Sequence, residues 1–312
     1  MNKTNRSIFG FCLVLLSASF VFAQTVSTPV VGFSKESLPA GQHFFAPNFI
    51  KPAVYSGTAS LSGASVTGLS LSGSLGLTTY NDRQNFPTHY LEITSGPYAG
   101  TYYDISSNTA NSVTLVQTPN ASGSVTVVVR PHVTLGDVIK ADSGIGEYSD
   151  SISVYDNSGN FSSYYFAGGV VTGDDFSTSM GHVPVPPGKG VGINAGGNLQ
   201  VTTSGQVRNQ ALNVPVYPGA VNVVGMLNPS GATKLTSLSL GQQLDAYSES
   251  ATLYDSSGNL SLVAIAYSDG QDATDDTFTP YTSTTSPSVG TKGAMLVNVG
   301  SAKYITVPPA TN

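Results

Sequence analysis

The chain has 312 residues, of which only 10% are charged, and its formal net charge is −6. Its 12 lysine and arginine residues form no basic cluster, so neither a nucleic-acid partner nor an anionic membrane surface is expected, because both require gathered positive charge. The 34 glycines and the shortage of good helix formers argue against a helical protein and favour an all-β fold.

Residues 1–23 have the pattern of a cleaved export signal. The basic residues Lys3 and Arg6 precede an apolar run that is short for a membrane span, and the small residue Ala23 marks the expected cleavage site. An uncleaved anchor is the alternative. Cys12 is the single cysteine of the chain and lies inside this segment. We therefore expect a secreted, cysteine-free mature chain, without disulfides, that resides in the periplasm, on the outer surface or outside the cell.

The stretch from about 61 to 130 predicts a small inserted β-subdomain. It opens with a Ser/Gly-rich segment, alternates at Leu91 and Ile93, reverses at 96–100 and closes on the β-branched run 124–130. The mature chain is long enough for about two domains, so this insertion would interrupt the first of them.

Two later stretches predict β-hairpins with the same turn. In the first, Ile152 and Val154 alternate with serines before DNSGN (156–160); in the second, Leu253 precedes DSSGN (255–259). Asp and Asn side chains can hydrogen-bond the backbone of such turns, and glycine takes the positive φ that they need. Both blocks are therefore expected to be strand, turn and strand.

The likeness between the two halves extends beyond the hairpins. Short segments recur in the same order: LPAGQHFFAPNFIKP (38–52) and VYPGAVNVVGMLNP (216–229), VTLGD (133–137) and LSLGQ (238–242), PPGKGVGI (186–193) and VGTKGAML (289–296). This order predicts an internal duplication. We expect two tandem β-sandwich-like units, 24–207 and 208–312, with one short helix over 240–247. Whether they pack as one core or two stays open.

Several segments, taken together behind an export signal, resemble one family. They are TPVVGFSKESLPAG (28–41), HYLEITSGPYAGTYYDISSNTANSVTL (89–115), SDSISVYDNSGNFSSYYFAGG (149–169) and VPVPPGKGVGI (183–193). Together they are similar to a family of uncharacterised exported β-rich proteins found mainly in verrucomicrobial bacteria. Members often carry a tryptophan after the acidic segment, where this chain has Phe176 and Phe278. The resemblance implies bacterial origin and export, and it implies no activity or cofactor.

Acidic residues gather in two loops that follow the hairpins. Like charges this close repel one another unless solvent or a cation screens them, and calcium is bound by carboxylate oxygens. The candidate calcium ligands are Asp174 and Asp175 in the first loop and Asp269, Asp272, Asp275 and Asp276 in the second. A solvated acidic loop is the alternative. The hairpin turns themselves match a calcium loop less well, because their glycine comes fourth and no glutamate follows.

Other constellations give no catalytic prediction. Lys189 in PPGKG lacks the Ser or Thr and the following helix that a phosphate-binding loop requires. The histidines and the mature glutamates are scattered along the chain: His43, His89, His132 and His182, and Glu36, Glu92, Glu147 and Glu249. A hydrolase whose site is assembled only in space stays open.

Tyrosines are the remaining candidates for binding. Adjacent strand residues face opposite ways, so one residue of each pair, Tyr102–Tyr103 and Tyr164–Tyr165, is expected to face solvent. Tyr164 and Tyr165 are candidate ligand-binding residues that could stack on sugars, with cross-strand aromatic packing as the alternative. The sequence thus favours a non-catalytic exported protein of the cell surface, matrix or an assembly, with a protein or glycan partner. A carbohydrate-binding module and a hydrolase are the alternatives.

Overall fold

The computed structural model is almost entirely β, which confirms the predicted all-β class. It describes residues 30–79, 85–156, 160–229, 231–255, 260–290 and 293–310. The expected export signal, 1–23, and most of the two hairpin turns lie outside the described residues. In these described ranges, no helix has the length and apolar character needed to cross a membrane.

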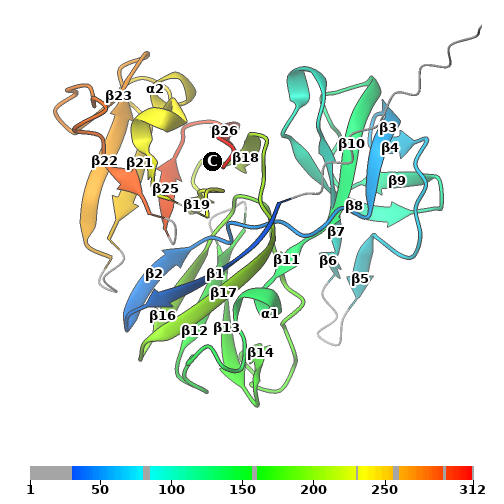
Figure 1. Cartoon of the computed structure of the whole chain (residues 1–312), viewed down its shortest axis with the longest axis horizontal. Coiled ribbons are helices and arrows are strands. Elements are labelled where there is room, and N and C mark those ends of the chain that lie inside the picture. The colour runs from blue at the N-terminus through cyan, green and yellow to red at the C-terminus, as the bar shows by residue number, and fades with distance from the viewer. Residues whose placement is uncertain are drawn as a thin grey trace, which may run out of the picture.

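Three bodies make up the described chain: a first β unit, a barrel and a second β unit (Figure 1). The barrel, which is cyan to green at the right of Figure 1, is a closed sheet in the order β10-β3-β4-β9-β8-β7. Its strands are β3 (Tyr55–Ser62), β4 (Ser65–Thr67), β7 (His89–Ile93), β8 (Tyr102–Asn108), β9 (Ser112–Leu115) and β10 (Gly123–Pro131). The short pair β5 (Leu77–Thr79) and β6 (Asn85–Pro87) and the turn η1 (Gly96–Tyr98) accompany it.

Alternating residues of the barrel strands point inward and form its core. Leu91 and Ile93 of β7 and Val127 and Val129 of β10 are completely buried there. Closure leaves such a sheet without an unpaired edge. The barrel strands begin at Tyr55 and end at Pro131, so they cover the stretch, about 61–130, where the inserted subdomain was expected.

The first unit is built on a five-stranded antiparallel sheet in the order β14-β13-β12-β16-β2. Two ribbons, β1–β17 and β11–β15, and the one-turn helix α1 (Leu135–Val138) share one core with it. The strands are β1 (Val31–Leu38), β2 (Gly41–Phe45), β11 (Val133–Thr134), β12 (Ser151–Tyr155), β13 (Phe161–Ala167), β14 (Val170–Thr172), β15 (Pro184–Val185), β16 (Val191–Ala195) and β17 (Leu199–Gln206).

The second unit has the same arrangement. Its sheet runs β23-β22-β21-β25-β19, its ribbons are β18–β26 and β20–β24, and α2 (Leu240–Gln243) follows the turn η2 (Leu235–Leu238). The strands are β18 (Leu212–Val216), β19 (Asn222–Gly225), β20 (Thr233–Lys234), β21 (Ser250–Tyr254), β22 (Leu262–Ser268), β23 (Ala273–Thr274), β24 (Ser288–Val289), β25 (Ala294–Asn298) and β26 (Lys303–Val307). The two units therefore share strand order and chain direction. Their origin by duplication stays a prediction.

Each of the two L-G segments forms a one-turn helix, α1 in the first unit and α2 in the second. At α1, the Asp137 carboxylate accepts hydrogen bonds from the Thr134 N–H, at 2.9 Å, and from its hydroxyl, at 3.0 Å. These contacts belong to a capping box, which stabilises a helix start. The second helix, α2, ends at Gln243 and not at Tyr247, because the next residue, Leu244, already has extended backbone, with φ −97° and ψ 144°.

Reciprocal contacts of edge strands join the two units. Strand β2 of the first unit forms a bridge to Gly293 of the second. In return, β19 of the second unit pairs with the turn before β16: the Gly190 N–H donates to the Val223 carbonyl, at 3.0 Å, and the Gly225 N–H donates to the Gly188 carbonyl, at 2.9 Å. A small core lies between the units and contains Ala46, Val223 and Ala294.

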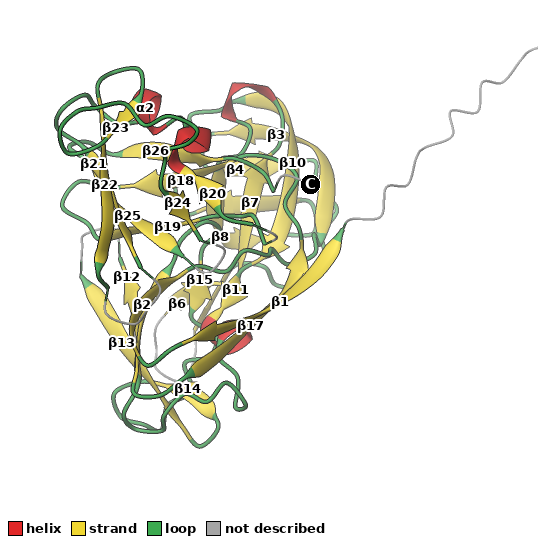
Figure 2. Ribbon diagram, turned by 60° about the vertical axis from the view of Figure 1, so that its left-hand side comes forward, coloured by secondary structure: helices red, strands yellow, loops and turns green. Residues whose placement is uncertain are grey.

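The barrel interrupts the first unit in sequence but packs on the second in space. Tyr90 of β7 and Tyr102 of β8 lie in the same core as Leu212 and Val214 of β18. In Figure 2, β7 and β8 lie beside β18, and the Asn213 N–H of β18 donates to the carbonyl of Gly100, at 2.9 Å. The barrel thus ties the two units together.

This packing overturns one expectation about the tyrosines. Tyr102 and Tyr103 are both buried, so the prediction that one of them faces solvent is wrong. The alternation of strand β8 holds, since Tyr103 faces the barrel core and Tyr102 faces the core of the second unit. A second body covers the face that the sequence assigns to solvent.

Candidate ligand-binding surface

Two clusters of three aromatic side chains lie at equivalent places on the two units. The first aromatic cluster consists of Tyr148, Tyr165 and Phe176, and the second consists of Tyr247, Tyr267 and Phe278. In each cluster the phenylalanine ring contacts both tyrosine rings: the centroids lie 5.4 and 5.0 Å apart in the first cluster and 5.0 and 5.5 Å apart in the second. These distances are typical of tilted or edge-to-face aromatic pairs.

The loop residues of both clusters are exposed and have an unusual backbone. Tyr148 and Tyr247 expose 61% and 63% of their surface. Both have φ 60°, while Phe176 has φ 52° and Phe278 has φ 59°. Six non-glycine residues in the described part of the chain have positive φ, and these four are among them. Left-handed backbone costs an L-residue about 1–2 kcal/mol, and such strain gathers at functional sites.

Hydrogen bonds of the loops fix this backbone. The Tyr148 N–H donates to the Phe166 carbonyl of β13, at 2.9 Å, and the Tyr247 N–H donates to the Ser268 carbonyl of β22, at 3.0 Å. Each loop tyrosine is thereby anchored to the strand that carries the other tyrosine of its cluster, Tyr165 on β13 or Tyr267 on β22. The two clusters are built by the same local structure.

A buried carboxylate accepts hydrogen bonds from the backbone of each tyrosine loop. Asp150 accepts hydrogen bonds from the N–H of Gly146, at 2.7 Å, and of Gly196, at 2.9 Å. Glu249 occupies the matching place in the second unit, where it accepts from the N–H of Asp245, at 2.8 Å, and of Gly300, at 2.7 Å. Both carboxylates are almost completely buried, so the loops are held by bonds that water does not weaken.

The acidic loops position the phenylalanines. The Asp175 carboxylate accepts four hydrogen bonds, from the N–H and hydroxyl groups of Ser177 and Thr178. The Thr178 hydroxyl bond and the two backbone bonds hold the Asp175 pKa well below its usual range. In the second unit Asp275 accepts from Thr277 and Thr279 in a similar way, and the Thr277 hydroxyl and Thr279 N–H lower the pKa of Asp275. These aspartates stabilise the turns that present Phe176 and Phe278.

A shallow groove lies on the outer face of the first sheet, which also carries Tyr165. Its volume is about 340 Å³. Hydroxyl and amide side chains line it together with aromatic ones: Ser151, Ser153, Ser163, Gln42, Asn194, Phe44, Tyr155 and Phe161. Ser163 and Tyr165 are two residues apart on β13, so both face the same side of the sheet. The groove and the first aromatic cluster therefore lie along one face.

The structure separates the two tyrosines that the sequence proposes for binding. Tyr165 is half-buried and belongs to the first aromatic cluster. Tyr164 is 4% exposed and lies in the core of the first unit, so it offers no ring face to a ligand. The strict alternation along β13 explains the difference.

Three of the six candidate calcium ligands already accept hydrogen bonds within their own loops. Asp269 accepts hydrogen bonds from the N–H of Gln271, at 2.9 Å, and of Asp272, at 2.7 Å, as Asp175 and Asp275 do in their own turns. Asp174, Asp272 and Asp276 are exposed. No group of three or more His, Cys, Asp or Glu side chains in the described ranges is placed to hold a metal ion. The geometry assigns the bonded aspartates a turn-stabilising role.

The histidines do not come together into one site. His132 contacts Asp104, at 3.0 Å, His43 contacts the Pro39 carbonyl, at 2.8 Å, and His89 contacts the Thr88 hydroxyl, at 2.8 Å. The rings of His182 and Phe86 lie edge to face. Burial, together with the charges of His132 and Lys51, lowers the pKa of His89 to about 4.

The glutamates also have structural partners. Glu92 binds Arg208, Glu147 accepts from the Gly169 N–H, Glu36 binds Ser34, and Glu249 holds its loop and Lys303. These contacts give the hydrolase alternative no support.

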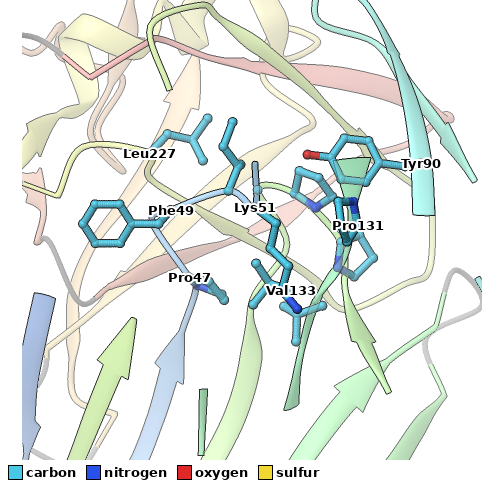
Figure 3. Close-up of a pocket in the computed structure, with 12 residues that line it drawn as sticks. Pro47, Phe49, Lys51, Tyr90, Pro131, Val133 and Leu227 are labelled. Carbon is cyan, nitrogen blue, oxygen red and sulfur yellow. The ribbon is translucent and has the colours of Figure 1, made fainter. Parts of the chain in front are cut away.

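A small cavity lies where the three bodies meet (Figure 3). Pro47, Phe49 and Val133 of the first unit, Tyr90 and Pro131 of the barrel and Leu227 of the second unit line it. Its volume is about 10 Å³, which is enough for about one water molecule. This cavity is a packing feature of the junction and too small for a ligand.

Sequence reasoning does not single out Tyr148 and Tyr247. A signal for them exists, because YSDS (148–151) and YSES (247–250) recur just before the two matching strands. Phe176 and Phe278 enter only through the family resemblance. Periodicity alone cannot find an exposed loop residue, since it reports which residues face a core.

Comparisons of this chain with protein-family models, with curated proteins and with solved structures found no match. The resemblance to exported verrucomicrobial proteins therefore stays a prediction.

Proposed function

We propose that this protein is an exported, non-catalytic binding protein that uses its two aromatic clusters to hold carbohydrate. The observation that carries the proposal is the repeated presentation of exposed rings on left-handed backbone in both units. Rings as exposed as those of Tyr148 and Tyr247 bury little apolar surface, and backbone strain lowers stability. A binding role accounts for both.

The chemistry of the first sheet favours a sugar over an apolar ligand. A pyranose ring has an apolar face of C–H groups and a rim of hydroxyls. Tyrosine and phenylalanine rings supply an apolar surface for such a face, and Ser, Gln and Asn side chains supply donors and acceptors for the rim. The groove of about 340 Å³ alongside the first aromatic cluster offers both kinds of contact.

The two clusters favour a chain of sugars over a single one. Each cluster presents only three rings, so one site alone is expected to bind weakly. Two linked sites raise the overall affinity when one long ligand can reach both, because the second contact becomes intramolecular. We therefore expect a polysaccharide to bind more tightly than its own monosaccharide.

Residence at the cell surface or in the matrix is part of this proposal. The basic and apolar pattern of residues 1–23 supports export, and a sparse charge supports contact with neutral polymers. Cell fractionation of the native strain, with detection of an N-terminus at Gln24, tests this part. Retention of the whole chain in the cytoplasm would contradict it.

The binding proposal is tested with a panel of neutral and acidic polysaccharides. Tyr148→Asn and Tyr247→Asn remove a ring while keeping the left-handed backbone, because asparagine adopts that conformation more readily than most residues. Together they are expected to weaken binding about tenfold or more, since burying one aromatic side chain contributes about 1.5–3 kcal/mol. Tyr98→Ala is the matched control, because Tyr98 is a partly exposed tyrosine on the barrel, outside both clusters.

Two results would overturn the proposal. One is the absence of binding to every glycan tested. The other is glycan binding that the double variant leaves unchanged. A folded double variant, checked by its thermal midpoint, excludes loss of structure as the cause.

A further inference from the structure

A second pocket, separate from both aromatic clusters, lies where the barrel, the first unit and the second unit meet. We call it the tyrosine pocket. It is lined by Tyr102, Tyr103, Asp104, Gln117, Pro186, Lys189, Pro215, Tyr217 and Tyr304. Four tyrosines, one lysine and one aspartate thus converge from three bodies on a volume of about 110 Å³.

Lys189 is the unusual member of this pocket. Its Nζ lies 5.7 Å from the centroid of the Tyr217 ring, a distance at which the ring attracts the ammonium group. In the described part of the chain it has no carboxylate partner, whereas Lys51 pairs with Asp137 and Lys303 pairs with Glu249. Burial lowers the pKa of Lys189 to about 8, which marks incomplete compensation of its charge.

The backbone turn that carries Lys189 is held by a hydrogen bond and by close packing against β18. The Lys189 N–H donates to the Pro186 carbonyl, at 3.0 Å, which closes the turn. At Gly188 an added Cβ would lie 2.4 Å from a methyl group of Val214, so the turn is pressed against β18. A fixed turn that carries a desolvated cation lowers the ordering cost of binding an anion.

The other polar groups can serve a ligand that carries hydroxyls as well as a charge. The Tyr102 hydroxyl is buried and has no hydrogen-bond partner among the described residues, and Tyr102 is only 9% exposed. Burial, with the charge of Asp104, keeps the Tyr102 pKa well above its usual value, so this hydroxyl remains a donor. Asp104 itself contacts His132, at 3.0 Å, which leaves its second oxygen for a hydroxyl.

We propose that the tyrosine pocket is a further binding site, which takes the carboxylate-bearing end of a small acidic sugar and pairs its carboxylate with Lys189. The volume admits a carboxylate and part of a sugar ring and is below the range of pockets that enclose larger ligands. This site does not depend on the aromatic clusters, and its ligand need not be the polymer that they hold.

The experiment compares glucuronate, glucose and acetate by calorimetry on the full mature protein. Glucuronate is expected to bind, glucose to bind far more weakly, and acetate to bind less tightly than glucuronate because it lacks the hydroxyl contacts. Lys189→Gln is expected to weaken glucuronate binding about tenfold or more, as loss of a charge-assisted contact predicts. Lys140→Gln, at an exposed lysine on the first unit, is the control and should change nothing.

A second measurement guards against a folding defect in the variant. In the wild-type protein, glucuronate is expected to raise the pKa of the Lys189 ammonium group, followed by NMR of its ε-CH₂ group, because a carboxylate stabilises the charged form. The proposal is overturned if glucuronate does not bind, binds no more tightly than acetate, or leaves the Lys189 pKa unchanged. Glucuronate binding should persist in the Tyr148→Asn/Tyr247→Asn variant, which separates this proposal from the proposed glycan binding.

Discussion

Arg208, in the segment that leads into the second unit, forms a buried bidentate ion pair with Glu92 of barrel strand β7. The two contacts are 2.8 Å from Nη1 to Oε2 and 2.5 Å from Nη2 to Oε1, and both side chains are 3% exposed. The same guanidinium donates to the carbonyls of Gln210 and Ala211. One arginine therefore joins the barrel to the chain segment between the two units.

Removing one partner of this pair should destabilise the protein strongly. Arg208→Met leaves the Glu92 carboxylate buried without its cation, and we expect the free energy of unfolding to fall by about 3–5 kcal/mol. Denaturant unfolding measures the loss. The matched control is Lys51→Met, because Lys51 and Asp137 form a far more exposed pair, for which about 0–1 kcal/mol is expected. Equal losses at the two sites would contradict this prediction.

The contact between the units depends on glycine at position 225. A Cβ added to Gly225 would lie 2.0 Å from the Cβ of Ala46, so Gly225→Ala forces the two edge strands apart. We expect a loss of about 1–3 kcal/mol in the free energy of unfolding, as overpacking usually gives. Gly197→Ala is the control, since nothing lies within 4 Å of its added Cβ. The prediction fails if both variants unfold at the same denaturant concentration.

Replacing Tyr148 should weaken glycan binding without lowering the stability of the protein. Its ring is largely exposed and its backbone is left-handed, a conformation that glycine adopts at little cost. Tyr148→Gly is therefore expected to leave the free energy of unfolding unchanged or to raise it by up to about 1 kcal/mol. Glycan binding should weaken in the same variant. A loss of more than about 1 kcal/mol in stability would instead identify the ring as a structural element.

His89 should make the stability depend on pH. Its pKa is lowered from 6.5 to about 4 in the folded protein, chiefly by burial. The unfolded chain binds the proton first, so the contribution of His89 is fully present above pH 6.5 and is lost as the pH falls towards 4. Unfolding midpoints measured across this range should fall less steeply in His89→Gln. The same pH dependence in variant and wild type would refute this role.

Calcium should have no effect on thermal unfolding. The bonded aspartates of the acidic loops, Asp175, Asp269 and Asp275, already accept hydrogen bonds from their own turns, so a cation would have to displace those donors. Scanning calorimetry with calcium and with a chelator should give the same midpoint. A midpoint raised by calcium and lowered again by Asp276→Asn would restore the calcium hypothesis.

Local sequence patterns alone determined the all-β fold class and the inward faces of several strands. The alternation of Ile152 with serines predicts the inward face of β12, where Ile152 is completely buried, because a strand with one buried face repeats every second residue. The same rule separates Tyr164 from Tyr165. The recurring segments VTLGD and LSLGQ also mark matching places in the two units, where α1 and α2 form.

Only the tertiary structure decided which outward faces are free and which residues meet. It buries Tyr102 against the second unit, brings Tyr148 to Phe176, and places Lys189 over Tyr217. None of these pairings follows from the periodicity of apolar residues. The sequence of a strand or loop does not show which distant part of the chain packs on its outer face. The fold class follows from the local alternation of apolar and polar residues. The candidate sites, in contrast, form where separate bodies and loops come together.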